Sequence, residues 1–141
     1  MSRAVIEART WIGTPYVHGA SVKGVGTDCL GLIRGVWRGC VGAEPEAPPS
    51  YTPDWGEVGG VEVLDAAARR YMILVDLAQS RPGDVLLFRM REAAVAKHLG
   101  ILSAVGREAA FIHAYDRHGV VESPLSEPWR AKVTGCFRLP L

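Results

Sequence analysis

Near the start of the chain, apolar residues recur every three or four positions, the spacing that puts them on one face of an α-helix. This apolar face consists of Ala4, Val5, Ala8, Trp11 and Ile12. Ser2 precedes the pattern and is a residue type that caps helix starts, whereas Gly13 followed by Pro15 cannot continue a helix. The pattern therefore predicts a first helix that begins after Ser2 and ends by Gly13.

A second helical pattern opens near Asp28, after a glycine-rich loop over residues 13–27. Its apolar positions are Leu32, Ile33, Val36 and Trp37, and Gly39 marks its end. Either Thr27 or Asp28 can cap this helix. A short third helix is predicted over residues 61–70.

The second half of the chain contains short apolar runs separated by turn residues, which is typical of β-strands. Strands are predicted over residues 72–77, 84–90, 98–104 and 109–115, with weaker ones over 120–122 and 133–139. Turns are predicted at Gly83-Asp84, Gly106-Arg107 and His118-Gly119. Helices ahead of an antiparallel sheet of about five to six strands indicate an α+β fold, and residues 1–141 are expected to form one domain.

Residues 42–60 interrupt this order with a proline-rich stretch. It contains Pro45, Pro48, Pro49 and Pro53, which exclude a continuous helix or a central strand. Tyr51 and Trp55 lie in the same stretch, and aromatic residues of this kind are enriched at interface hot spots. We expect a surface excursion that either covers the helical core or docks onto a partner.

Charge and hydropathy narrow the classes of function. The chain has 16 basic and 15 acidic residues, a formal net charge of +1 and 48% hydrophobic residues. This balance provides no basic field for nucleic acid, and no apolar run reaches the roughly 18 residues that insert into a membrane as a span. Charges at Arg3, Glu7 and Arg9 interrupt any signal-peptide core, so we expect synthesis in the cytoplasm without an export signal.

Cysteine spacing and sequence motifs predict neither a metal nor a cofactor. The cysteines Cys29, Cys40 and Cys136 form no CxxC pair, so reduced thiols are expected and a thiolate zinc site is not. Cys40 and Cys136 have no polar residues at useful spacing and are assigned to packing. The acidic residues Glu44, Glu46, Asp54 and Glu57 are interpreted as a solvated loop face. The sequence contains no glycine-rich nucleotide-binding motif.

One cysteine and two histidines stand where a thiol enzyme places its reacting groups. Cys29 lies where the glycine-rich loop meets the second helix, and the N–H groups at a helix start stabilise a thiolate. His98 and His113 each lie in an apolar run, on two strands that can hold their rings side by side. The hypothesis is a Cys29 nucleophile, a His98 base and an orienting His113. The alternative is that all three are packed residues of the core.

Four segments, the first in two parts, resemble the NlpC-type cell-wall cysteine peptidases. They are WIGTPY at 11–16 with TDCLGL at 27–32, RPGDVLLF at 81–88, KHLGI at 97–101 and FIHA at 111–114. The segments occur in the family's order and cover most of the chain. The resemblance implies a papain-like α+β fold, in which a cysteine on a helix attacks a peptide carbonyl. By motif position it makes Cys29 the nucleophile, His98 the base and His113 the orienting residue.

The resemblance also implies residues that contact the substrate. Tyr16 is expected to reach over the site, and Asp28 to help hold the free amine of the substrate, although Asp28 can equally serve as the helix cap. Leu30 stands where many family members have serine, and residues 17–20 replace their Trp-Gly-Gly segment, so the cleft is expected to be lined differently. His18 is expected to be a loop residue, with a polar residue that lines the cleft as the alternative.

Within this family, residues 22–24, 35–38, 51–55 and 88–91 resemble members encoded with phage and gene-transfer-agent tails. This implies an enzyme at the tail tip or baseplate, with a tail hub protein as its partner and the periplasm or cell wall as its place of action. The predicted reaction is hydrolysis of peptidoglycan stem peptides, with the family resemblance pointing to the bond between D-glutamate and diaminopimelate. The alternatives are a tail adaptor with little turnover, and an amidase or acyltransferase with the same thiol chemistry.

Overall fold

The computed structural model describes residues 2–46 and 62–141, and its first helices form where the sequence supplies caps. Ser2 Oγ accepts the N–H of Val5 at the start of α1 (Arg3–Arg9), and Asp28 caps α2 (Cys29–Cys40). α1 ends before Gly13, because Thr10 and Trp11 donate to carbonyls three residues back and tighten the last turn. α3 (Val63–Tyr71) confirms the predicted third helix, whereas α4 (Glu127–Arg130) was not predicted.

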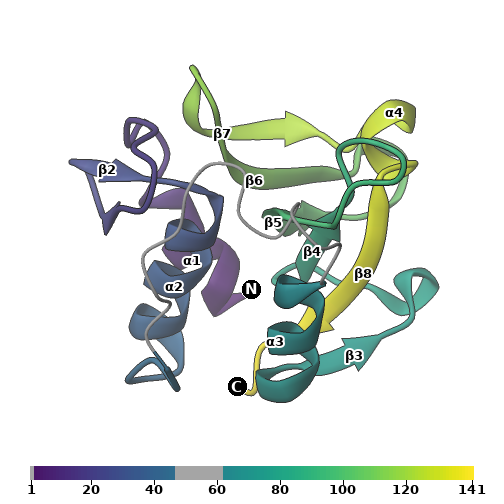
Figure 1. The fold of residues 1–141 in the computed structure, drawn as a ribbon, viewed down its shortest axis with the longest axis horizontal. Coiled ribbons are helices and arrows are strands. Elements are labelled where there is room, and N and C mark those ends of the chain that lie inside the picture. Colours follow the sequence, from purple (N-terminus) through teal and green to yellow (C-terminus); the bar gives the residue numbers. More distant parts are fainter. Residues whose placement is uncertain (1, 47–61) are drawn as a thin grey trace.

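Six strands form one antiparallel sheet in the order β3-β8-β4-β5-β6-β7 (Figure 1). They are β3 (Ile73–Val75), β4 (Val85–Phe88), β5 (His98–Ala104), β6 (Ala110–Tyr115), β7 (Gly119–Pro124) and β8 (Val133–Arg138). The predicted α+β fold is thereby confirmed. Short 3-10 helices occupy Leu77–Gln79 and Gly106–Glu108. The sequence did not predict the hairpin of β1 (Ser21–Val22) and β2 (Gly26–Thr27), because strands of two residues show no alternation.

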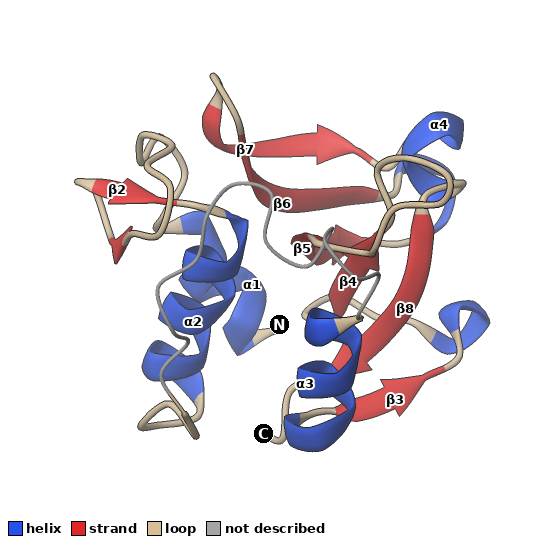
Figure 2. Ribbon diagram, viewed as in Figure 1, coloured by secondary structure: helices blue, strands red, loops and turns tan. Residues whose placement is uncertain are grey.

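The sheet is buried on both faces at its centre. α1 and α2 pack against each other and against β5, while α3 lies against β3 and β8 (Figure 2). Alternate residues of β4 point to opposite faces: Val85 and Leu87 join the helix-side core, which includes Leu32 and Val36 of α2. Leu86 and Phe88 join the outer core, which includes Leu102, Phe111 and Leu125, with Trp129 packed against it. No described helix is long and apolar enough to cross a bilayer.

Two cysteines lie away from the reacting groups proposed above. Cys136 is buried in the outer core, but its Sγ lies 3.8 Å from a carboxylate oxygen of Asp84. Arg138 donates to both oxygens of this carboxylate, at 2.8 and 2.9 Å. Cys40 is partly exposed, with its Sγ 3.6 Å from the carbonyl oxygen of Arg3. The expectation that neither cysteine has a polar partner is therefore wrong, although both still lie in packed surroundings.

The predicted excursion at 42–60 lies mostly outside the described residues, and with it Tyr51, Trp55, Asp54 and Glu57. Its first residues are attached to the helices. Glu44 accepts from Arg34 at 2.6 Å and from Arg38 at 3.0 Å, both on α2. Glu46 accepts from the Tyr71 hydroxyl of α3 at 2.7 Å. The interpretation of Glu44 as part of a solvated loop face is wrong, because two arginines bind it.

Candidate active site

Asp28 joins the glycine-rich loop to the start of α2. Its Oδ1 accepts the N–H of Gly31 at 2.7 Å, and its Oδ2 accepts the N–H of Gly19 at 2.8 Å. His18 Nδ1 lies 4.0 Å from the same Oδ2, and this histidine is exposed in the loop as expected. Asp28 itself is only 3% exposed. The structure thus identifies it as the cap, while its contact with a substrate amine stays a prediction.

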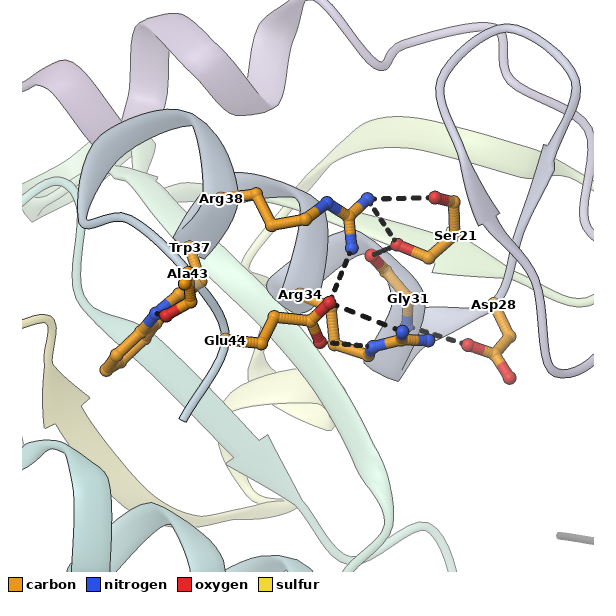
Figure 3. A network of polar contacts seen from close by, with 8 residues as sticks. All are labelled: Ser21, Asp28, Gly31, Arg34, Trp37, Arg38, Ala43 and Glu44. Atoms are coloured by element: carbon orange, nitrogen blue, oxygen red, sulfur yellow. Dashed lines mark hydrogen bonds and ion pairs between the residues drawn. The ribbon is translucent and has the colours of Figure 1, made fainter. Parts of the chain in front are cut away.

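A network of polar contacts holds the loop against α2 (Figure 3). Ser21 Oγ donates to the carbonyl of Gly31 at 2.6 Å, and Arg38 donates to the carbonyl and Oγ of Ser21 at 2.8 and 2.9 Å. Gly31 leaves no room for a side chain, since a Cβ there would lie 2.0 Å from the carbonyl oxygen of Ala20. Cys29, two residues before Gly31, is therefore positioned by contacts on both sides of the helix start.

The thiol of Cys29 lies against the chain just before β5. Its Sγ donates to the carbonyl of Lys97 at 3.4 Å. Loss of hydration raises the pKa of this thiol to about 12, and the charge of Asp28 acts in the same direction. Backbone N–H groups of Leu99, Leu30 and Cys29 itself lower the pKa, but by less. The expected stabilisation of the thiolate by the helix start is present, but burial outweighs it, so the thiol is neutral at pH 7 and needs a base.

The candidate base, His98, is the residue after the one whose carbonyl Cys29 contacts. Nε2 of His98 lies 2.8 Å from Nδ1 of His113, and the two rings meet edge to face. Burial, followed by the nearby His113, lowers the pKa of His98 to about 3. Burial, followed by the charge of His118, lowers the pKa of His113 to about 4. Both imidazoles are thus neutral at pH 7, and each can accept one proton.

Strand pairing sets the places of the two rings. His98 is opposite Phe88 of β4, and β6 pairs with the other side of β5. Gly100 lies beside His113, and a Cβ at that position would come within 3.3 Å of His113 Cβ and 2.8 Å of the Phe111 ring. Gly100 therefore lets Phe111 and His113 of β6 pack closely against β5.

Aromatic rings surround the histidines. Trp129 lies 5.6 Å from the His98 ring and 5.1 Å from the His113 ring between centroids. Tyr115 stacks on His113, and His118 stacks on Tyr115 at 5.2 Å. His118 lies in the turn between β6 and β7, as predicted. Trp129 was not predicted from the sequence, because it lies in no recognised motif and reaches the site only through the position of α4.

Tyr16 and Leu30, like Cys29, are partly buried and pack against the helix-side core. Tyr16 is half-buried and forms an isolated bridge to Thr27. Withdrawal from water raises the pKa of the Tyr16 phenol, and nearby negative charge, that of Asp28 included, acts in the same direction. Leu30 is half-buried and packs against the helix-side core. Their contacts with substrate stay predictions.

Ser123 of β7 is a further polar neighbour, which the sequence did not reveal. Its Oγ lies 3.0 Å from Nε2 of His113. Ser123 lies one residue beyond the strand predicted over 120–122, and a serine there gives no signal before the strand pairing is known. Among residues 2–46 and 62–141, no three histidine, cysteine or acidic side chains are grouped so as to hold a metal ion. The arrangement of a thiol, two neutral imidazoles and helix-start N–H groups is suited to acyl transfer.

Known proteins resemble this chain over most of its length. It is 33% identical over 135 residues to the gamma-DL-glutamyl hydrolase of Bacillus subtilis, a match that covers 95% of this chain and 28% of that protein. It is 30% identical over 131 residues to the murein DD-endopeptidase/murein LD-carboxypeptidase of Escherichia coli, covering 93% of this chain and 58% of that protein. The chain thus spans less than two thirds of either relative.

Solved structures of similar fold, and a comparison with known protein families, point to the same family as these relatives. An NlpC/P60 family protein from Bacillus cereus has the same fold, with a TM-score of 0.65, 19% identity and coverage of 98% of this chain and 40% of that one. A lipoprotein-like NLP/P60 family protein from Staphylococcus aureus has a TM-score of 0.62 at 22% identity, covering 96% of this chain and 40% of that one. Residues 13–138 match the NlpC/P60 family as a whole. The chain belongs to the NlpC/P60 family.

Proposed function

We propose that this domain hydrolyses peptide bonds in peptidoglycan stem peptides with Cys29 as nucleophile. One observation carries the proposal: Cys29 Sγ contacts the carbonyl of Lys97, and the next residue, His98, is hydrogen-bonded to His113. The names of the relatives from Bacillus subtilis and Escherichia coli, a gamma-DL-glutamyl hydrolase and a murein endopeptidase, support this substrate class.

The reaction follows from the protonation states of these groups. His98 takes the proton from the Cys29 thiol as the sulfur attacks the substrate carbonyl, so the thiolate forms only when it is used. Backbone N–H groups at the start of α2 stabilise the oxygen anion of the tetrahedral intermediate. The protonated His98 then donates to the leaving amine, which leaves a thioester on Cys29. Water, deprotonated by His98, hydrolyses this thioester and restores the thiol.

The bond that we propose is the one between D-glutamate and diaminopimelate. The resemblance of the motifs around Cys29 and His98 to NlpC-type peptidases supports it. Mass spectrometry of purified muropeptides after incubation with the enzyme tests it, with Cys29→Ala as the control. New peptides ending in D-glutamate are expected from the wild type alone. Release of whole stem peptides would identify an amidase, ligated products an acyltransferase, and unchanged muropeptides would reject catalysis.

We further propose that a phage-like or gene-transfer-agent tail carries the enzyme to the cell wall. Support comes from the four segments at 22–24, 35–38, 51–55 and 88–91 that resemble tail-encoded members. Quantitative mass spectrometry of purified particles tests the proposal by measuring the copy number of this chain. The variant is the double substitution Tyr51→Ala, Trp55→Ala. The wild-type chain should occur at fixed copy number and the double variant should be lost. Its absence from wild-type particles would reject tail delivery.

A further inference from the structure

The hydrogen bond between the two histidines continues to Ser123. Nε2 of His98 lies 2.8 Å from Nδ1 of His113, and Nε2 of His113 lies 3.0 Å from Oγ of Ser123. His113 is paired with Val121, so Ser123, two residues further along β7, faces the same side of the sheet. His98, His113 and Ser123 form what we call the histidine relay. His113 is fully buried, so the partners of both its ring nitrogens come from the protein.

The two hydrogen bonds of the histidine relay can both donate toward Ser123 or both donate toward His98. Each neutral imidazole carries one N–H and one unprotonated nitrogen. In the outward direction, His98 Nε2–H donates to His113 Nδ1, and His113 Nε2–H donates to Ser123 Oγ. In the inward direction, the Ser123 hydroxyl donates to His113 Nε2, and His113 Nδ1–H donates to His98 Nε2.

Only the outward direction allows His98 to act as a base. In the inward direction Nε2 of His98 accepts a hydrogen bond, so its single proton lies on Nδ1, and neither nitrogen can take the proton of Cys29. In the outward direction Nδ1 is unprotonated and receives that proton: the S–H bond breaks and an N–H bond forms. The imidazolium then donates from both nitrogens, so the bond to His113 keeps its direction throughout.

We propose that Ser123 is a positioning residue that sets this direction by accepting the Nε2–H of His113. The inference rests on the proposed function insofar as His98 is the base of that reaction. Without the Ser123 oxygen, the buried Nε2–H of His113 loses its acceptor, and a buried unpaired donor is unfavourable. His113 then shifts its proton to Nδ1, which turns the relay inward and protonates His98 at Nδ1.

Histidine NMR tests the proposal without any substrate. Two-bond 1H–15N spectra of the full chain, labelled with 15N-histidine, report at pH 7 which nitrogen of each ring is protonated. Signals are assigned with His18→Gln and His118→Gln. Wild type should show both His98 and His113 protonated at Nε2, and Ser123→Ala should move the proton of His113 to Nδ1. A wild-type His98 protonated at Nδ1, or unchanged tautomers in Ser123→Ala, would overturn the proposal.

Kinetics with muropeptides give a second measurement. Ser123→Ala should lower kcat by about tenfold with KM unchanged, the scale of one lost hydrogen bond. Ser123→Thr keeps the hydroxyl and should retain most of the activity. The matched control is Ser103→Ala, which removes the hydroxyl of a buried serine on β5 and should leave kcat unchanged. If the wild type cleaves no stem peptide, the proposed function fails, while the NMR spectra still decide the role of Ser123.

Discussion

The candidate site has a cysteine half and a histidine half, and different interactions hold each of them in place. The cysteine half, at the start of α2, is held by hydrogen bonds among residues close in sequence, such as Asp28 with Gly19 and Gly31. The histidine half lies on three paired strands, with its rings packed against the aromatic residues of the outer core. The halves meet where Cys29 contacts the carbonyl of Lys97, 68 residues away.

The cysteine half therefore places the sulfur of the nucleophile, whereas the histidine half supplies the group that removes its proton. The local hydrogen bonds place the sulfur of Cys29, yet its surroundings raise the pKa of the thiol and keep it neutral. The sheet places His98 in a buried setting that keeps the imidazole neutral, although the same burial weakens it as a base. Changes in the histidine half should therefore act on rate and acid stability. In the cysteine half, loss of Cys29 itself should act on rate, and changes to the residues that position it should act on the stability of the helix start.

The largest effect is expected from removing the sulfur. Cys29→Ala should abolish muropeptide hydrolysis, because no other group can form the thioester. The melting temperature should remain close to that of the wild type, since the residue is small and partly exposed. Cys40→Ala is the matched control and should retain full activity. Hydrolysis by Cys29→Ala at the wild-type rate would place the nucleophile elsewhere.

The two histidines should differ in how much they contribute. His98→Ala should lower kcat by at least about a hundredfold, the usual scale for a positioned general base. His113→Gln should retain measurable activity, because an amide can still hydrogen-bond to His98. Initial rates on the same muropeptide compare them. Equal losses in both variants would show that His113 does more than orient its neighbour.

Acid should destabilise the histidine half. The folded-state pKa values of His98 and His113, about 3 and about 4, lie below the value near 6.5 of an unfolded histidine. The unfolded chain therefore binds more protons, and the free energy of unfolding should fall as the pH drops from about 6.5 toward 4. Urea titrations at pH 7, 6 and 5 measure this loss. The double variant His98→Gln, His113→Gln should show a shallower dependence, and an unchanged slope would contradict the assignment.

The cap should have a moderate effect on stability. Asp28→Ala removes the acceptor for the N–H groups of Gly31 and Gly19, and should lower the free energy of unfolding by about 1–2 kcal/mol. Urea denaturation at pH 7 measures the change. Asp65→Ala is the control, since Asp65 pairs with the exposed Arg69 on α3, and it should change stability by less than about 0.5 kcal/mol. Similar losses in both would mean that the cap adds little.

The smallest effect is expected at the outer edge of the cysteine half. Arg38→Ala removes an ion pair with Glu44 whose arginine side chain is 38% exposed, so it should change the free energy of unfolding by only about 0.5 kcal/mol. Thermal denaturation and muropeptide hydrolysis measure stability and activity. Activity should be unchanged. A loss as large as that in Asp28→Ala would show that the contacts of Arg38 with Ser21 also position the nucleophile.

Local patterns predicted much of the fold and the residues of the candidate site. Helix periodicity and the caps at Ser2 and Asp28 depend on neighbours within four residues, so they can be read before folding. Four main strand runs were predicted from apolar runs and turn residues, and all four contain strands of the sheet. Cys29, His98 and His113 were selected by residue type and by motif order, both of which are properties of the sequence.

The tertiary structure decided how these residues interact. Ser123 meets His113 only because β7 pairs with β6 in one register, and Trp129 reaches the rings only through the packing of α4 against the outer core. The neutral thiol of Cys29 was missed for a related reason. The sequence shows the helix start that lowers the pKa of the thiol, whereas the loss of hydration that raises it more depends on every element packed around the sulfur.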